Sequence, residues 1–353
     1  MRRGLIARSL DELPDAVLDA RLAQLRAAIG QAQLDALLIY TNNTRPAGVS
    51  WLTGFVPYWS EALLVVRPEG LPVLVAALTY RVKSWIERTS RLADVIHTPR
   101  IGLEAGRMIA AAKADARVGI ADFGALASGI TADLRDGGAR LALTDATELF
   151  ASVRGRADPA ELALARTAAA IAAQALAQAR HDRDLDEIIA RVEAQARELG
   201  AEEIYVAAAP DLARDRSLRR IEGDAAAGES FALRATVAYK GSWVRLTRTL
   251  FGPEVPASLN EEAAARLARA VAGLPDAAGF ANFSSWLVEG CRVAQPLEAL
   301  TGSQIGEVHR PTPGALVSVQ ASLAVDGRPI LIAAPAVLGE QGEGARLLLA
   351  LAT

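Results

Sequence analysis

Residues 231–251 contain two runs in which apolar and polar residues alternate, on either side of Tyr239, Lys240 and Gly241. This pattern predicts a β-hairpin, because alternate residues of a strand face opposite sides of a sheet. Matching the apolar residues of the two runs places the turn at Tyr239 and Lys240 and makes one face of the hairpin apolar. The apolar residues that share this face are Phe231, Leu233, Val237, Tyr239, Val244, Leu246 and Leu250.

The other face of the predicted hairpin is polar and carries two arginines. The same register puts Arg234 directly opposite Arg245, with threonines beside them. Like charges directly across a sheet are destabilising unless a negative group lies between them. We therefore expect an anionic partner, which is a side chain, a bound ion or a substrate carboxylate. The alternative is that both arginines are solvated or pair with Glu222, Glu229 or Glu307.

The composition argues against binding to nucleic acid or to a membrane. Acidic residues number 41 and basic residues 38, and the formal net charge of −3 provides no field that would hold an anionic polymer or surface. We find no apolar stretch of spanning length and no apolar core of a signal peptide. The single cysteine, Cys291, cannot form an internal disulfide. We therefore expect a cytoplasmic protein with small-molecule or protein partners.

At 353 residues the chain is long enough for two domains, and residues 1–152 are predicted to form an α/β domain. Apolar residues at helical spacing follow Pro14 and predict the first helix. Short apolar runs bounded by Gly, Pro or Asn then predict strands that alternate with helices. The predicted strands are residues 35–40, 61–67, 72–77 and 117–121, and the predicted helices are residues 14–30, 79–88 and 105–113.

Residues 153–353 are predicted to form an α+β domain. Asp158, followed by Pro159 and Glu161, is a typical helix N-cap and predicts a long alanine-rich helix to about residue 180. A second helix is expected at 185–199, and the pattern then changes to alternating strands. The remaining predicted elements are a helix at residues 260–272 and strands at residues 315–325 and 330–338.

Four segments of the chain carry motifs in a fixed order. Residues 34–39 and 49–55 come first, followed by the helix that begins at Asp158, and Gly228-Glu229 and Thr247-Arg248-Thr249 then frame the hairpin. This series resembles the creatinase, aminopeptidase P and prolidase family, over nearly the whole chain. The resemblance implies a creatinase-like N-terminal domain followed by a pita-bread domain.

The resemblance also implies that the metal ligands of the family are missing. In its metallopeptidases two aspartates eleven residues apart hold a dinuclear metal centre, and their positions here are Arg234 and Arg245. Residues 313–320 resemble the motif that carries the first glutamate ligand, with Gln320 in its place, and residues 332–337 lack the closing glutamate. The family's histidine loop has no counterpart beyond Ile305-Gly306. Hard divalent cations need several oxygen or imidazole ligands and are repelled by arginine, so we expect no metal and no cofactor.

Creatinase implies another chemistry, because it hydrolyses a carbon–nitrogen bond without metal and uses a histidine as general acid and base. The matching segment here, residues 210–220, has no histidine. His309 is then the candidate for proton transfer and Glu229 the candidate carboxylate base. The alternatives are a solvated loop histidine and a glutamate that pairs with an arginine. His97 and His181 are expected to be solvated or structural.

The ligand contacts implied by the resemblance lie in both domains. In this family the N-terminal domain of one subunit contributes to the cleft of the other, which implies a homodimer with Tyr58, Trp59 and Glu61 as contacts. The alternative is a turn whose aromatic residues cover the edge of the domain. The contacts expected in the second domain are Arg234, Arg245, Arg248, Arg310 and Gln320.

Two functions from different classes follow. The first is a metal-free homologue that binds a small anionic amino-acid-like or peptide-like metabolite in an arginine-lined cleft, with or without hydrolysis of a carbon–nitrogen bond. The second is a catalytically inactive interaction or regulatory subunit that pairs with an active paralogue or another protein, and whose cleft is filled by its own side chains. The group that faces Arg234 and Arg245 distinguishes the two.

Overall fold

The computed structural model describes residues 9–42, 45–55, 60–181, 184–290, 304–305, 312–340 and 343–350. The chain divides into two compact units, Arg2–Arg154 and Gly155–Thr353, where the sequence predicts a boundary after residue 152. Within the described ranges, none of the helices combines the length and the apolar character that a membrane span requires.

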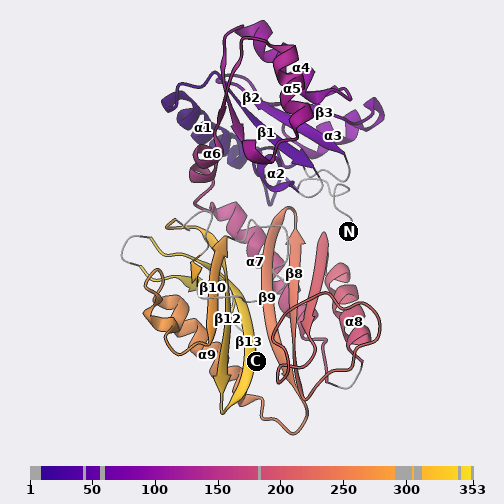
Figure 1. The fold of residues 1–353 in the computed structure, drawn as a ribbon, viewed down its shortest axis with the longest axis vertical. Helices are drawn as coiled ribbons and strands as arrows, with labels where there is room; N and C mark the ends of the chain where they lie inside the picture. The colour runs from indigo at the N-terminus through magenta and orange to yellow at the C-terminus, as the bar shows by residue number, and fades with distance from the viewer. Residues whose placement is uncertain are drawn as a thin grey trace. The chain divides into compact units, whose positions relative to one another are not determined.

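The first unit is an α/β domain built on a six-stranded mixed sheet, as its apolar runs predict (Figure 1). The strand order is β4-β3-β2-β1-β5-β6; β2 is antiparallel to both of its neighbours and the other pairs are parallel. Helices α1, α2, α3 and α6 bury apolar residues on one face of the sheet, and α4 and α5 cover the other. The strands are β1 (Ala36–Asn42), β2 (Glu61–Val66), β3 (Val73–Ala76), β4 (Asp94–His97), β5 (Arg117–Ala121) and β6 (Ala142–Asp145). The helices are α1 (Asp15–Gln31), α2 (Ala47–Thr53), α3 (Lys83–Thr89), α4 (Ile101–Ala112), α5 (Ser128–Gly137) and α6 (Thr147–Val153).

The second unit is an α+β domain in which helices cover one face of a mostly antiparallel sheet (Figure 1). The strand order is β11-β10-β12-β13-β9-β8-β7, with β14 beside β13. Helix α7 begins as predicted, because the Asp158 side chain accepts a hydrogen bond from the Glu161 N–H at 2.8 Å. The strands are β7 (Glu203–Ala209), β8 (Ser230–Tyr239), β9 (Ser242–Phe251), β10 (Ser285–Gly290), β11 (Gln304–Ile305), β12 (Leu316–Val325), β13 (Arg328–Val337) and β14 (Arg346–Leu347). The helices are α7 (Pro159–Leu176), α8 (Leu185–Glu198) and α9 (Ser258–Ala272).

The hairpin of β8 and β9 confirms the predicted faces but corrects the predicted register. The turn lies at Lys240 and Gly241, which both have positive φ angles (45° and 79°), as a type I′ turn requires. Lysine is an uncommon residue at such a position, so this turn was difficult to predict from local residue preferences. Arg234 is therefore opposite Thr247, and the expectation that Arg234 and Arg245 lie directly opposite each other is wrong. A shift of two residues leaves every side chain on its predicted face, so both arginines still share the polar one.

Candidate functional site

The face of the C-terminal sheet that lies opposite the helices is polar, and we call it the polar sheet face. Residues paired across neighbouring strands share a face, and one such row consists of Arg234 on β8, Thr247 on β9, Ala333 on β13 and Gln320 on β12. The polar residues of this face include Arg234, Thr236, Arg245, Thr247, Thr249, Glu289, Ser318, Gln320 and Ser322. The sheet therefore brings three of the predicted ligand contacts together.

A single carboxylate links both arginines. Glu289 on β10 accepts an ion-pair hydrogen bond from Arg245 through its Oε1, and the same oxygen accepts from the Gln320 side-chain amide at 3.3 Å. Gln320 in turn accepts a hydrogen bond from Arg234 through its own Oε1, at 3.4 Å. The long Arg234 side chain crosses two strands to reach Gln320, and this is sterically allowed because small residues occupy the intervening positions of the row.

The members of this network are buried or, in the case of Glu289, half-buried. Arg234 is 1% exposed, and the side chains of Arg245 and Glu289 are 3% and 13% exposed. Arginine and glutamate are almost never this buried unless they are paired, because removing a charge from water costs several kcal/mol. The ion pair with Glu289 therefore offsets part of the cost of burying Arg245, and loss of the Glu289 carboxylate would remove an anionic partner from a buried guanidinium.

The polar sheet face does not fit the metal centre that the family resemblance implies. Arginines hold the places of the two aspartates, an amide holds the place of the first glutamate, and Ala333 is the residue of the closing strand that lies beside Gln320. Glu289 on β10 supplies a carboxylate, which already pairs with Arg245. Within the described residues there is no group of three or more His, Cys, Asp or Glu side chains that could hold a metal ion. Divalent cations require several such ligands and are repelled by the guanidinium groups.

Four hydroxyl groups add further hydrogen-bonding capacity to the same face. The hydroxyl oxygens of Thr236, Thr247, Ser318 and Ser322 are buried and have no hydrogen-bond partner within the described part of the chain. Each hydroxyl can donate one hydrogen bond and accept two, so the face retains polar groups that could bind water or a small polar molecule.

Two of the predicted site residues lie elsewhere on the C-terminal unit. Arg248 is opposite Leu233 on the helix-covered face of the sheet, so it does not join Arg234 and Arg245. Glu229 precedes β8, and its exposed carboxylate accepts from Arg328 at 2.5 Å. The structure therefore supports the alternative that Glu229 partners an arginine, although a surface one.

The remaining predicted contacts fall in or near parts of the chain without a described structure. His309, Arg310, Tyr58 and Trp59 lie outside the described residues, as does Cys291. Glu61 is described at the start of β2 and accepts a hydrogen bond from the Tyr40 hydroxyl at 2.7 Å. Burial, followed by this carboxylate, raises the pKa of Tyr40 to about 12, so the tyrosine keeps its proton and donates to Glu61 at neutral pH.

Two histidines contact the backbone of the chain. The His181 Nε2 lies 2.7 Å from the Gly228 carbonyl oxygen, and its ring packs against Phe231 with centroids 5.4 Å apart. The His97 Nδ1 lies 2.9 Å from the Leu78 carbonyl oxygen. These contacts support the structural role expected for both histidines.

Glu289 is the functional residue that the sequence analysis missed. It lies in a short segment that matches no motif of the family, so the resemblance did not draw attention to it. The signal was present in the alternation of residues 285–290: Trp286 and Val288 pack against the apolar core, which directs Leu287 and Glu289 to the opposite face. A strand assignment for this segment would have placed a carboxylate on the same sheet face as the two arginines.

Comparisons with known proteins agree with this architecture. Residues 21–155 match the Creatinase/Prolidase N-terminal domain family. The chain is similar in structure to an X-Pro aminopeptidase from Thermotoga maritima (TM-score 0.71, 16% identity, covering 94% of this chain and 98% of that one). It is also similar to an Xaa-Pro dipeptidase from Bacillus anthracis (TM-score 0.68, 18% identity, covering 94% of this chain and 97% of that one). A third similar structure is the prolidase from Pyrococcus horikoshii (TM-score 0.67, 15% identity, covering 95% of this chain and 98% of that one). No curated protein sequence matches the chain. At these identities the solved structures establish the fold alone.

Proposed function

We propose that this chain, which carries a creatinase/prolidase N-terminal domain and has the fold of the Xaa-Pro peptidases, is a catalytically inactive interaction or regulatory subunit without metallopeptidase activity. The observation that carries the proposal is the Glu289 carboxylate, which is shared by Arg245 and Gln320 on the polar sheet face. The groups that face the arginines are thus side chains of the protein itself.

The charge of the polar sheet face supports the loss of metal-dependent catalysis. A dinuclear centre needs anionic oxygen ligands to offset the charge of two cations. Arginine stays protonated at every accessible pH, so Arg234 and Arg245 cannot become ligands when conditions change. The ion pair also ties Glu289 to Arg245, so this carboxylate is engaged and is not available as a metal ligand.

The absence of metallopeptidase activity is tested by titration of the purified protein with Mn²⁺, Co²⁺ and Zn²⁺ in a calorimeter, in parallel with assays on Xaa-Pro dipeptides. We expect no stoichiometric binding at the polar sheet face and no hydrolysis above a protein-free control. Stoichiometric binding of a metal together with dipeptide hydrolysis would overturn the proposal.

The interaction role is tested by native mass spectrometry of the protein isolated from its own cells without high salt. If the chain binds a partner protein, the spectrum should contain the mass of a stable heteromeric complex in addition to multiples of the 37.1 kDa chain. The same complex must reform from the separately purified components. Exclusively monomeric or homomeric species under these conditions would count against a heteromeric role.

A second candidate function is the binding of a small anion at the polar sheet face. The buried hydroxyls of Thr236, Thr247, Ser318 and Ser322 favour it, because they offer hydrogen bonds beside two guanidinium groups. A carboxylate that enters this face would have to displace or share the Glu289 interaction with Arg245. Binding would therefore be competitive with an internal carboxylate.

Calorimetric titration with carboxylate metabolites separates the two candidates. Anion binding predicts a saturable signal that is lost in both Arg234→Ala and Arg245→Ala, with the fold checked by circular dichroism. An interaction subunit predicts no such signal in the parent protein. Equal binding by the parent and by both variants would exclude the polar sheet face as an anion site.

A further inference from the structure

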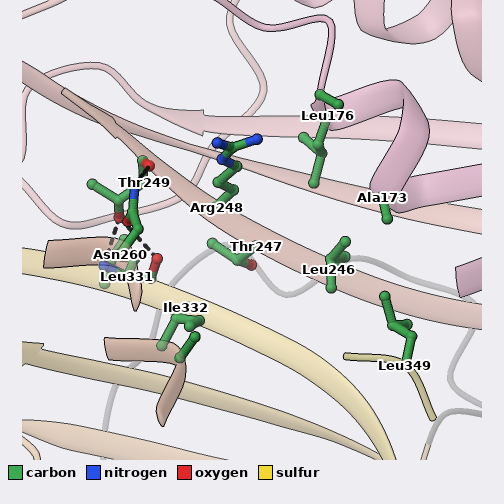
Figure 2. A pocket seen from close by; sticks show the side chains of 12 residues that line it. Ala173, Leu176, Leu246, Thr247, Arg248, Thr249, Asn260, Leu331, Ile332 and Leu349 are labelled. Atoms are coloured by element: carbon green, nitrogen blue, oxygen red, sulfur yellow. Dashed lines mark hydrogen bonds between the residues drawn. The ribbon is translucent and has the colours of Figure 1, made fainter. Parts of the chain in front are cut away.

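A separate cavity lies on the other side of the C-terminal sheet. It has a volume of about 120 Å³ and lies where α7 and α9 pack on β9 and β13 (Figure 2). Most of its lining is apolar and includes Ala173 and Leu176 from α7, Ala264 from α9 and Ile332 from β13. Alanines on the two helices leave this space open above the sheet.

Arg248 is the charged residue of this cavity. It occupies a position on β9 between Leu246 and Leu250, where the alternation of the strand directs side chains toward the apolar core. Figure 2 shows its side chain leaving β9 on the same side as Leu176. Arg248 is partly buried, and among the described residues no carboxylate pairs with it. Burial lowers the pKa of its guanidinium, and no anion in the described part of the chain offsets this effect.

Two of the other polar side chains near Arg248 are engaged with the backbone, and strand alternation directs the Thr247 hydroxyl toward the polar sheet face. The Asn260 side chain donates to the Thr249 carbonyl oxygen at 3.1 Å, and the Thr249 hydroxyl donates to the Leu331 carbonyl oxygen at 2.8 Å. The guanidinium is therefore the group best able to recognise a ligand here, and a carboxylate matches its planar pair of donors.

We propose that this cavity is a binding site for a small aliphatic carboxylate, whose head group pairs with Arg248 while its chain lies against Leu176 and Ile332. An apolar cavity of about 150 Å³ accommodates benzene, so the space here suits a chain of about four to six carbons. This site is distinct from the polar sheet face, because Arg248 and Arg234 lie on opposite faces of the sheet. It is independent of the proposed function.

The proposal explains why an arginine interrupts an apolar strand face. Placing a guanidinium in a partly buried position without a counter-charge costs stability, and natural sequences accept such costs mainly at functional sites. The competing explanation is that the aliphatic stem of Arg248 covers apolar surface while its head reaches water. That explanation predicts no preference for an anionic ligand.

The test is a calorimetric titration of the full chain with butanoate, hexanoate and hexan-1-ol. We expect saturable binding of the carboxylates with a Kd of about 1 mM, and no saturable binding of the alcohol. Arg248→Met keeps the apolar stem and removes the charge, so carboxylate affinity should fall about tenfold or more. Ala264→Leu keeps the charge and fills the cavity, so hexanoate binding should be lost. Arg328→Met, at the exposed pair with Glu229, is the matched control and should bind like the parent.

Two results would overturn the proposal. One is the same carboxylate affinity in the parent and in Arg248→Met, both verified as folded by circular dichroism. The other is no saturable binding of either carboxylate by the parent up to about 10 mM, ten times the expected Kd.

Discussion

Replacing Glu289 by glutamine should destabilise the C-terminal unit strongly. The substitution keeps the size of the side chain and removes its charge. Arg245, whose side chain is 3% exposed, then stays protonated and buried without the Glu289 carboxylate. Breaking a buried ion pair from one side costs about 3–5 kcal/mol. For a domain of this size each kcal/mol lowers the melting temperature by about 2–4 °C, so the expected loss is about 6–20 °C.

Differential scanning calorimetry is the appropriate assay, because it can resolve the transitions of the two units. The matched control is Glu229→Gln, which removes an exposed carboxylate from its pair with Arg328. Exposed pairs contribute about 0–1 kcal/mol, so this variant should melt close to the parent. The double variant Arg245→Met with Glu289→Leu should recover most of the lost stability, because a buried ion pair is often replaced by apolar residues at little cost. Equal melting temperatures for Glu289→Gln and Glu229→Gln would refute the account of a buried, shared carboxylate.

Three further predictions test other parts of the structure. The triple variant Arg234→Asp, Arg245→Asp, Gln320→Glu restores carboxyl groups to one sheet face; it should be less stable in chelator and regain stability with Mn²⁺, whereas the parent should not respond. Indifference of the triple variant to Mn²⁺ in thermal denaturation would contradict the assignment of these positions. Asp35→Asn should destabilise the protein by about 1 kcal/mol at pH 7, because a backbone N–H and a lysine lower the pKa of Asp35. A carboxyl group whose pKa is lowered by folding stabilises the folded state at pH values above its pKa in the unfolded chain. The difference in unfolding free energy between Asp35→Asn and the parent, measured by urea denaturation, should therefore vanish as the pH falls through the pKa of Asp35 in the folded state. A difference that persists below that pH would refute this role of Asp35. Asp158→Ala should cost about 1 kcal/mol in the same assay through loss of the cap of α7, and an unchanged midpoint would show that the cap is dispensable.

The fold was largely predictable because periodicity identifies both faces of each element. The hairpin shows the limit: the polar face of β8 and β9 follows from alternation, but the register depends on a turn at Lys240 and Gly241 whose first residue rarely adopts a positive φ. Local patterns also placed the beginning of α7, where Asp158, Pro159 and Glu161 carry an unambiguous capping signal.

The candidate site was predictable only in part, because it depends on contacts between distant segments. Arg234, Arg245 and Gln320 come together because their strands occupy one sheet, and the family resemblance supplied that arrangement. Glu289 could not be found in the same way, since β10 matches no motif and its pairing with β12 is non-local. The family resemblance grouped Arg248 with the other arginines as a ligand contact, and strand alternation separates it from them.

We propose that an internal carboxylate, held by arginine, stands on the polar sheet face where the family resemblance implies a metal centre. The most direct test of this proposal is a crystal structure of the protein grown with excess Mn²⁺, with diffraction recorded at the manganese absorption edge. We expect Glu289 between Arg245 and Gln320, and no anomalous density on the polar sheet face. An anomalous peak between Arg234 and Arg245, or a Glu289 side chain turned away from Arg245, would contradict it.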